Sequence, residues 1–265
     1  MISSIVSKVK QKQIAQLVAN RKRIDGRGLT DYREIKVEAG IIERAEGSAR
    51  VLLGKTQVLV GVKIDIGEPF SDIPDQGVLT VNAELVPLAS PTFEPGPPDE
   101  NSIELARVVD RGIRESKAIG LEDLCITPGK KVFVVFIDVY VLNHDGNLID
   151  ASALAALAAL LNTKMYNYEL KDDEIIRKPG YKPLPIRNYP IAITFGKINN
   201  QLIVDPWLEE EQVMDARLTM TIDKEGNICS IQKGGSGYFT TQQILEAAKI
   251  AKERATELRK LVVET

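Results

Sequence analysis

The sequence predicts an α+β protein built from two halves, each of which runs from a sheet into a helix. Alternating apolar and polar residues, typical of strands, occur with helical segments in residues 31–167 and again in residues 191–265. A stretch rich in proline and charge separates these two series, and we expect a linker at residues 168–190. The chain has 265 residues, of which 44% are hydrophobic, so it can bury one large core or two modest ones.

Residues 1–30 are expected to form an N-terminal helix, at residues 4–20, and a basic connector with the sequence RKRIDGRG. In the first half, alternation predicts strands at residues 32–42, 49–53, 57–66, 78–85 and 131–142, with a tight hairpin at Gly54-Lys55-Thr56. The helix predicted at residues 150–161 is rich in alanine and apolar nearly all round. It should therefore be buried, and Asp150 is the expected N-cap.

The second half repeats this pattern with shorter strands. We expect them at residues 191–198, 201–204, 218–222 and 228–232, with turns at Asn199-Asn200 and Glu225-Gly226-Asn227. A final helix is predicted from Thr240 to Val262. The run Gly234-Gly235-Ser236-Gly237 follows a strand but lacks the GK[ST] ending of a phosphate-binding loop, so we interpret it as a flexible connection.

Composition excludes several classes of function. A net charge of −3 and a sequence pI near 5.5 argue against a protein that binds nucleic acid over its whole surface, so such binding must be local. No apolar run is long enough for a bilayer span, and we expect a cytoplasmic protein with no membrane partner. The single histidine, His144, lies in a predicted turn, which disfavours a Ser-His-Asp relay. Cys125 and Cys229 lack the spacing of a metal site and are expected to be buried free thiols.

The segment FEPGPPDENSIELARVVDRGIRESK, residues 93–117, predicts a proline-rich turn followed by a helix with an arginine face. Its packing face contains Leu105, Val109, Gly112, Ile113 and Ser116, and the opposite face gathers Arg107, Arg111 and Arg114. The arginine face can hold an anion. The turn before it is a poor phosphate site, because prolines offer no N–H and the carboxylates that follow repel negative charge.

Five ordered blocks resemble the RNase PH family: DGRGLTDYR, EGSARVLLGKTQVLVGVK, FEPGPPDENSIELARVVDR, HDGNLIDASALAALAAL and VDPWLEEEQVMDARLTM. Within that family the chain is most similar to the non-catalytic RNase PH-like ring subunit of the archaeal exosome, over residues 23–258. The resemblance implies an RNase PH-like fold with two packed βαβ-type halves. It also implies an alternating six-membered ring with a catalytic paralogue, a trimer of heterodimers that degrades RNA from its 3′ end with inorganic phosphate.

The resemblance also indicates which parts of the catalytic machinery are altered here. Active members carry an arginine pair where this chain has Gly96-Pro97-Pro98-Asp99-Glu100, and a Gly-Thr-Arg-type turn where it has Gly146-Asn147-Leu148. Asp205 matches the first family aspartate, and Glu211 stands at the second. We therefore expect no catalytic, phosphate-binding or metal-binding residue, two vestigial acids, and no positive lining beside Asp205. Taken alone, Glu209-Glu210-Glu211 is typical of a solvated helix start.

Arg107 and Arg111 lie one turn apart, about 6 Å along a helix, a spacing that lets them follow consecutive phosphates of an RNA strand. The resemblance implies that they contact RNA, with Arg114 as a weaker candidate. The competing interpretation is pairing within the helix, of Glu104 with Arg107 and of Arg111 with Glu115. The basic run Arg21-Lys22-Arg23 is expected to be solvated.

These observations favour a ring subunit that performs no chemistry alone but binds single-stranded RNA and completes the active site of its paralogue. Its expected partners are that paralogue and the RNA-binding cap proteins of the exosome. It needs no cofactor of its own, and inorganic phosphate with a divalent metal would serve the partner. Two alternatives stay open: the chain is itself a phosphate-dependent exoribonuclease that uses Asp205 and Glu211, or it is a purely architectural subunit.

Overall fold

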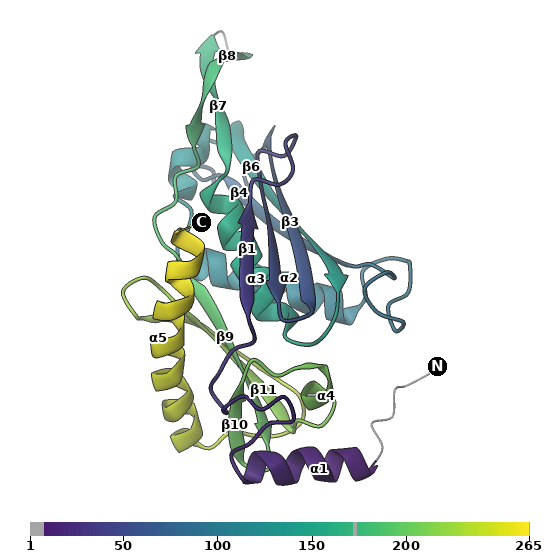
Figure 1. Cartoon of the computed structure of the whole chain (residues 1–265). Helices are drawn as coiled ribbons and strands as arrows, with labels where there is room; N and C mark the ends of the chain where they lie inside the picture. The colour runs from purple at the N-terminus through teal and green to yellow at the C-terminus, as the bar shows by residue number, and fades with distance from the viewer. Residues whose placement is uncertain (1–7, 172–173, 265) are drawn as a thin grey trace.

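The computed structural model describes residues 8–171 and 174–264 and confirms the α+β class, with one mixed and one antiparallel main sheet (Figure 1). A single buried cluster runs through both halves and includes Val60 on the first sheet, Leu157 on the central helix and Phe195 on the second sheet. No helix within the described ranges combines the length and the apolar character needed to cross a membrane.

The first sheet has the strand order β1-β2-β3-β6-β4, with β5 paired to β6. Its strands are β1 (Ile35–Ala39), β2 (Gly47–Leu53), β3 (Thr56–Gly67), β4 (Val78–Leu85), β5 (Cys125–Thr127) and β6 (Lys131–Asn143). Strand β4 runs parallel to β6, and the other pairs are antiparallel. The five predicted strands are confirmed, although β1 is shorter than expected, and the short β5 and the 3-10 helix η1 (Leu121–Leu124) were not predicted.

Two helices pack on this sheet, α2 (Glu100–Glu115) and α3 (Leu148–Leu161). Helix α3 contacts β2 and β3 on one side and β9 (Ile191–Ile198) of the second sheet on another, which explains why it is buried nearly all round. A Cβ on Gly47 would lie only 2.5 Å from the carbonyl oxygen of Ala159, so glycine allows β2 to approach α3 closely. The prediction that Asp150 is the N-cap of α3 is wrong, because Asn147 caps the helix from a left-handed backbone conformation with φ of 52°.

The second sheet has the order β10-β9-β11-β12 and is antiparallel throughout. Its strands are β9 (Ile191–Ile198), β10 (Gln201–Val204), β11 (Ala216–Ile222) and β12 (Ile228–Gly234). The short helix α4 (Leu208–Glu211) follows β10, and α5 (Thr241–Val263) closes the described chain with Thr240 as its N-cap. All four predicted strands are confirmed, and Gly234 belongs to β12 rather than to a connection.

The segment expected as a linker is largely a β-hairpin. Strands β7 (Lys164–Lys171) and β8 (Glu174–Pro183) pair antiparallel, and Figure 1 shows this hairpin projecting beyond both main sheets. Tyr166 and Tyr168 pack edge-on against Phe133, and the Arg177 guanidinium lies 4.2 Å above the centre of the Tyr166 ring. Aromatic packing therefore anchors the base of the hairpin, although its prolines and charges are typical of a loop.

Helix α1 (Lys8–Ala19) covers the second half, although the first half follows it in the sequence (Figure 1). Its Ile14 and Val18 form a small buried cluster with Ile198 and Ile203. Residues 4–7 of the predicted helix lie outside the described part of the chain. The expectation of buried thiols is wrong, because Cys125 and Cys229 are free but partly exposed.

Candidate functional site

The carboxylate of Asp205, at the end of β10, is fully buried and bound by two arginines and an asparagine. Arg33 donates its backbone N–H and Nε, both at 2.9 Å, and its Nη2 at 2.7 Å. Arg27 Nη1 and Asn147 Nδ2 each donate at 2.8 Å. Burial alone would raise the pKa of Asp205, but the hydrogen bonds and the charge of Arg33 outweigh it and lower that pKa below its usual value.

The expectation that no positive lining lies beside Asp205 is therefore wrong. Arg27 and Arg33 supply that charge, but their donors are engaged by the protein itself. Arg33 Nη1 also donates to the carbonyl of Asp145 at 2.6 Å, and Nη2 donates to that of Gly146 at 3.2 Å. The cations that could hold a free phosphate are thus occupied by an internal carboxylate and by backbone carbonyls.

The acidic run on α4 is not a solvated helix start. Glu210 is buried and forms a two-pronged ion pair with Arg23, whose Nε donates to Oε1 at 2.8 Å. Arg23 also donates at 2.8 Å to the carbonyls of Val204 and Asp205. The solvated interpretation of Arg21-Lys22-Arg23 is therefore wrong for Arg23, which ties the N-terminal connector to the second half.

The turn at Gly146-Asn147 binds three side-chain carboxylates in the place where the family resemblance suggests phosphate. The backbone N–H of Asn147 donates to Glu211 Oε1 at 2.8 Å, and its Nδ2 donates to Asp205 and, at 2.9 Å, to Asp150. Burial raises the pKa of Glu211 to about 7. The N-terminus of α3 is therefore filled by acids from this chain.

Asp150 joins the two halves below this turn. Its carboxylate accepts the Tyr32 hydroxyl at 2.7 Å, and the N–H and hydroxyl of Thr194 at 3.0 and 2.7 Å. Burial raises the pKa of Asp150 to about 6 even though these donors favour the charged form. Because Tyr32 precedes the first sheet and Thr194 lies on β9, this buried acid fixes the position of one half against the other.

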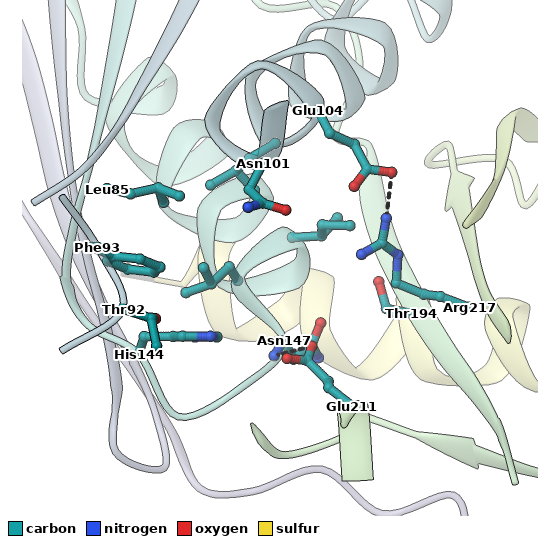
Figure 2. A pocket seen from close by; sticks show the side chains of 13 residues that line it. Leu85, Thr92, Phe93, Asn101, Glu104, His144, Asn147, Thr194, Glu211 and Arg217 are labelled. Carbon is teal, nitrogen blue, oxygen red and sulfur yellow. Dashed lines mark hydrogen bonds and ion pairs between the residues drawn. The ribbon is translucent and has the colours of Figure 1, made fainter. Parts of the chain in front are cut away.

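A pocket of about 250 Å³ lies beside Glu211, between α2, the start of α3 and the second sheet (Figure 2). Phe93 and His144 stack on one side, with ring centres 5.4 Å apart and planes 16° from parallel. On the other side, Arg217 Nη2 donates to Glu104 at 2.5 Å. Burial, with the charge of Arg33, lowers the pKa of His144, so the imidazole is neutral at pH 7.

The α2 arginines lie on the exposed face of the helix, as predicted, and the five residues of the expected packing face are buried: Leu105, Val109, Gly112, Ile113 and Ser116. The predicted pairs within the helix do not form. Glu104 binds Arg217, and Arg111 Nη1 contacts Gln232 Oε1 at 3.4 Å. Arg107 and Arg111 have no acidic partner within residues 8–171 and 174–264, whereas Arg114 pairs with Asp110 at 2.6 Å.

The turn before α2 is occupied in a similar way. Asp99 caps the helix by accepting the Ser102 N–H at 2.8 Å, and this bond lowers the pKa of Asp99. The first free N–H groups of α2 therefore face a carboxylate of their own chain. An anion cannot replace that carboxylate without breaking the cap.

Two family models match consecutive segments of the chain. The model of 3′ exoribonuclease family domain 1 matches residues 31–165, and that of domain 2 matches residues 188–254. The chain belongs to the RNase PH family. Exosome complex component Rrp42 of Thermococcus gammatolerans is 56% identical over 262 residues, which cover 98% of this chain and 96% of that protein. The Methanothermobacter thermautotrophicus protein of the same name is 50% identical and covers 96% and 94%.

Solved RNase PH family structures agree with the fold. A chain of the Archaeoglobus fulgidus exosome with RNA bound to the active site superposes with a TM-score of 0.88 at 49% identity, covering 95% of this chain and 97% of that one. A chain of an archaeal exosome core superposes with a TM-score of 0.87 at 44% identity, covering 99% of both chains.

Several residues of this RNase PH family site were not found from the sequence: Arg23, Arg27, Arg33, Asn147 and Arg217. Arg27 and Arg33 lie in the block DGRGLTDYR, which carried the resemblance but was given no role for its arginines. The only signal in the sequence was the position of these two arginines within one of the five blocks that carry the resemblance. Their partners lie more than 170 residues away, a distance that no local pattern bridges.

Proposed function

We propose that this chain is a non-catalytic ring subunit of an exosome, which binds RNA and completes the active site of a catalytic RNase PH-like paralogue. The single observation that carries the proposal is the contrast between two sets of arginines. Arg27 and Arg33 are engaged by Asp205, while Arg107 and Arg111 lie exposed with no acidic partner in the described chain.

The state of the acids supports a subunit without its own chemistry. Phosphorolysis needs donors for a free phosphate and an acid for a proton or a metal. Here the Asp205 carboxylate accepts five protein hydrogen bonds, from Arg33, Arg27 and Asn147, at 2.7 to 2.9 Å. A metal or a phosphate would have to displace charged hydrogen bonds, each worth about 1.5–3 kcal/mol. Inorganic phosphate, and any divalent metal, would then be bound by the paralogue.

The arginine face of α2 supports the RNA role. Two guanidinium groups one helical turn apart can each contact a phosphate of the same strand. Arg114 is a weaker part of the proposal because Asp110 neutralises it. The relatives called exosome components, and the similar exosome chain solved with RNA bound to the active site, support an RNA role for the proposed subunit. The proposal includes an alternating hexamer, RNA-binding cap proteins on the ring, and a cytoplasmic location.

The test is the double variant Arg107→Glu and Arg111→Glu, reconstituted with the catalytic paralogue. We expect a complex of unchanged mass, RNA binding at least tenfold weaker and a shallower salt dependence, because two phosphate contacts are lost. The matched control is Lys249→Glu with Lys252→Glu, which makes the same charge change on exposed positions of α5. Unchanged RNA affinity would exclude the RNA role.

The same experiment separates the alternatives. Loss of assembly in the double arginine variant, with RNA affinity retained in the remaining complex, would assign the arginines to a purely architectural contact. A purified chain that shortens RNA only when phosphate is added would establish an exoribonuclease that acts alone. Degradation that needs both subunits and phosphate agrees with the proposal.

A further inference from the structure

The pocket beside Glu211 has one aromatic side and one polar side. Phe93, half-buried in the loop after β4, stacks on His144, and the aliphatic groups of Leu85, Leu105 and Leu148 extend this apolar surface. At about 250 Å³ the pocket is slightly smaller than the sites of drug-sized ligands, which begin at about 300 Å³. That size and the aromatic wall suit one flat heterocycle.

The opposite side offers a donor and an acceptor that the protein does not use. Arg217 Nη2 donates to Glu104 and its Nε is buried beyond the reach of a ligand, but its Nη1 has no hydrogen-bond partner among the described residues. Glu211 accepts the Asn147 N–H through Oε1 only, so its Oε2 remains available on the pocket side. Figure 2 shows the Arg217 guanidinium on the opposite side of the pocket from Phe93, with the Glu211 carboxylate beside Asn147 and between His144 and Arg217.

The charge of the pocket selects against an anionic ligand. Glu104 and Arg217 neutralise each other and His144 is neutral, so Glu211, which is mostly ionised only above its pKa of about 7, is the only other lining residue that carries a charge. A phosphate would face this carboxylate with no free cation to balance it. A neutral ligand with a hydrogen-bond donor and acceptor side by side matches the pair formed by Glu211 and Arg217.

We propose that this pocket binds a nucleobase, with its ring against Phe93 and His144 and its polar edge between Arg217 and Glu211. Every nucleobase presents an adjacent donor and acceptor on one edge, so the site recognises the class rather than one base. The base comes either from a free nucleoside or from an RNA strand. This site goes beyond the proposed RNA contact, because Arg107 and Arg111 do not line the pocket.

In the test, the unmodified full-length chain is titrated separately with uridine, 3-methyluridine, ribose and inorganic phosphate, and NMR measures the binding of each compound. Uridine should bind saturably. 3-Methyluridine should bind at least tenfold more weakly, because its methyl group removes the N–H that Glu211 accepts. Ribose and phosphate should not compete. Equal binding of uridine and 3-methyluridine, or competition by ribose, would overturn the proposal without any variant that depends on correct folding.

Variants then assign the residues. Glu211→Gln places an amide N–H₂ where the pocket offers an acceptor, and it should weaken uridine binding about tenfold. Phe93→Leu should also weaken it, whereas Leu88→Ala, a change at an exposed residue of the same loop, should not. Full binding by a folded Glu211→Gln variant would contradict the assignment. Arg107→Glu with Arg111→Glu should leave uridine binding intact, so this proposal can fail independently of the RNA role.

A competition experiment identifies the source of the base. An oligouridine that displaces uridine from the reconstituted ring would assign the pocket to an RNA strand. Displacement by free nucleosides alone would assign it to a small metabolite. Failure of both to occupy the pocket would refute a nucleobase site.

Discussion

The buried Asp205 makes the sharpest prediction, because a catalytic acid and a structural acid respond differently to the same change. In Asp205→Asn the charge disappears, and the new amide N–H₂ faces donors from Arg33 or Arg27 instead of accepting from them. The carboxylate is fully buried, and the side chains of Arg33 and Arg27 are only 9% and 13% exposed. Removing one partner of a buried ion pair costs about 3–5 kcal/mol. We expect about 3 kcal/mol here, since water reaches part of both arginines.

Guanidinium unfolding of the full chain measures this loss through the fluorescence of Trp207, the single tryptophan, which lies two residues after Asp205. Asp75→Asn, at an exposed aspartate, is the matched control and should change the unfolding free energy by less than about 0.5 kcal/mol. The lowered pKa of Asp205 means that its contribution is present above pH 4 and is lost as pH falls through the folded-state value, so the two proteins should converge in acid. A stability change below about 1 kcal/mol at pH 7 would refute a structural role for Asp205.

Three further predictions concern the turn before α3. Gly146→Ala should lower the unfolding free energy by more than about 2 kcal/mol, because residue 146 has φ of 86° and an alanine Cβ would collide with the backbone nitrogen of Leu208. Thermal unfolding measures this loss, and little change in the unfolding free energy would contradict the prediction. In the same assay, the Asn147→Gly variant should be about 1 kcal/mol more stable than the Asn147→Ala variant. Both variants lose the side-chain hydrogen bonds of Asn147, but only alanine is strained at φ of 52°. Equal stability of the two variants would be inconsistent with that strain. The Glu211→Gln variant should gain stability relative to the parent protein as pH rises from 5 to 8. Burial raises the pKa of Glu211 to about 7, so ionising this carboxyl group destabilises the native state of the parent. Urea titrations in which the difference between the two proteins does not depend on pH would argue against this prediction.

Elements with a clear period could be predicted from the sequence almost to the residue. Strands β4, β9 and β10 begin and end where alternation predicted, and the buried and exposed faces of α2 follow its helical spacing. The β7–β8 hairpin could not be predicted in this way, because its prolines and charges are typical of a loop. Its strands are stabilised by the packing of Tyr166 and Tyr168 on Phe133, which the local sequence does not indicate.

The site was predictable only in part. Its acids and the exposed arginines are visible in the sequence. Which cation neutralises which acid depends on chain segments brought together by the fold, as with Arg33 and Asp205, or Arg23 and Glu210. The left-handed Asn147 also displaced the expected cap, because an asparagine can adopt that backbone conformation and still bond to Asp150.

The two hydrogen bonds from the Asn147 side chain constrain how this chain can change over evolutionary time. Replacing Asn147 with a residue that has no side-chain amide would remove the Nδ2 donor from Asp150 and Asp205. Loss of both Arg27 and Arg33 would leave the buried Asp205 carboxylate without a cationic partner among the described residues. Substitutions at this turn are therefore coupled to the stability of the buried acids, so that residues 27, 33, 147 and 205 are expected to change together rather than singly.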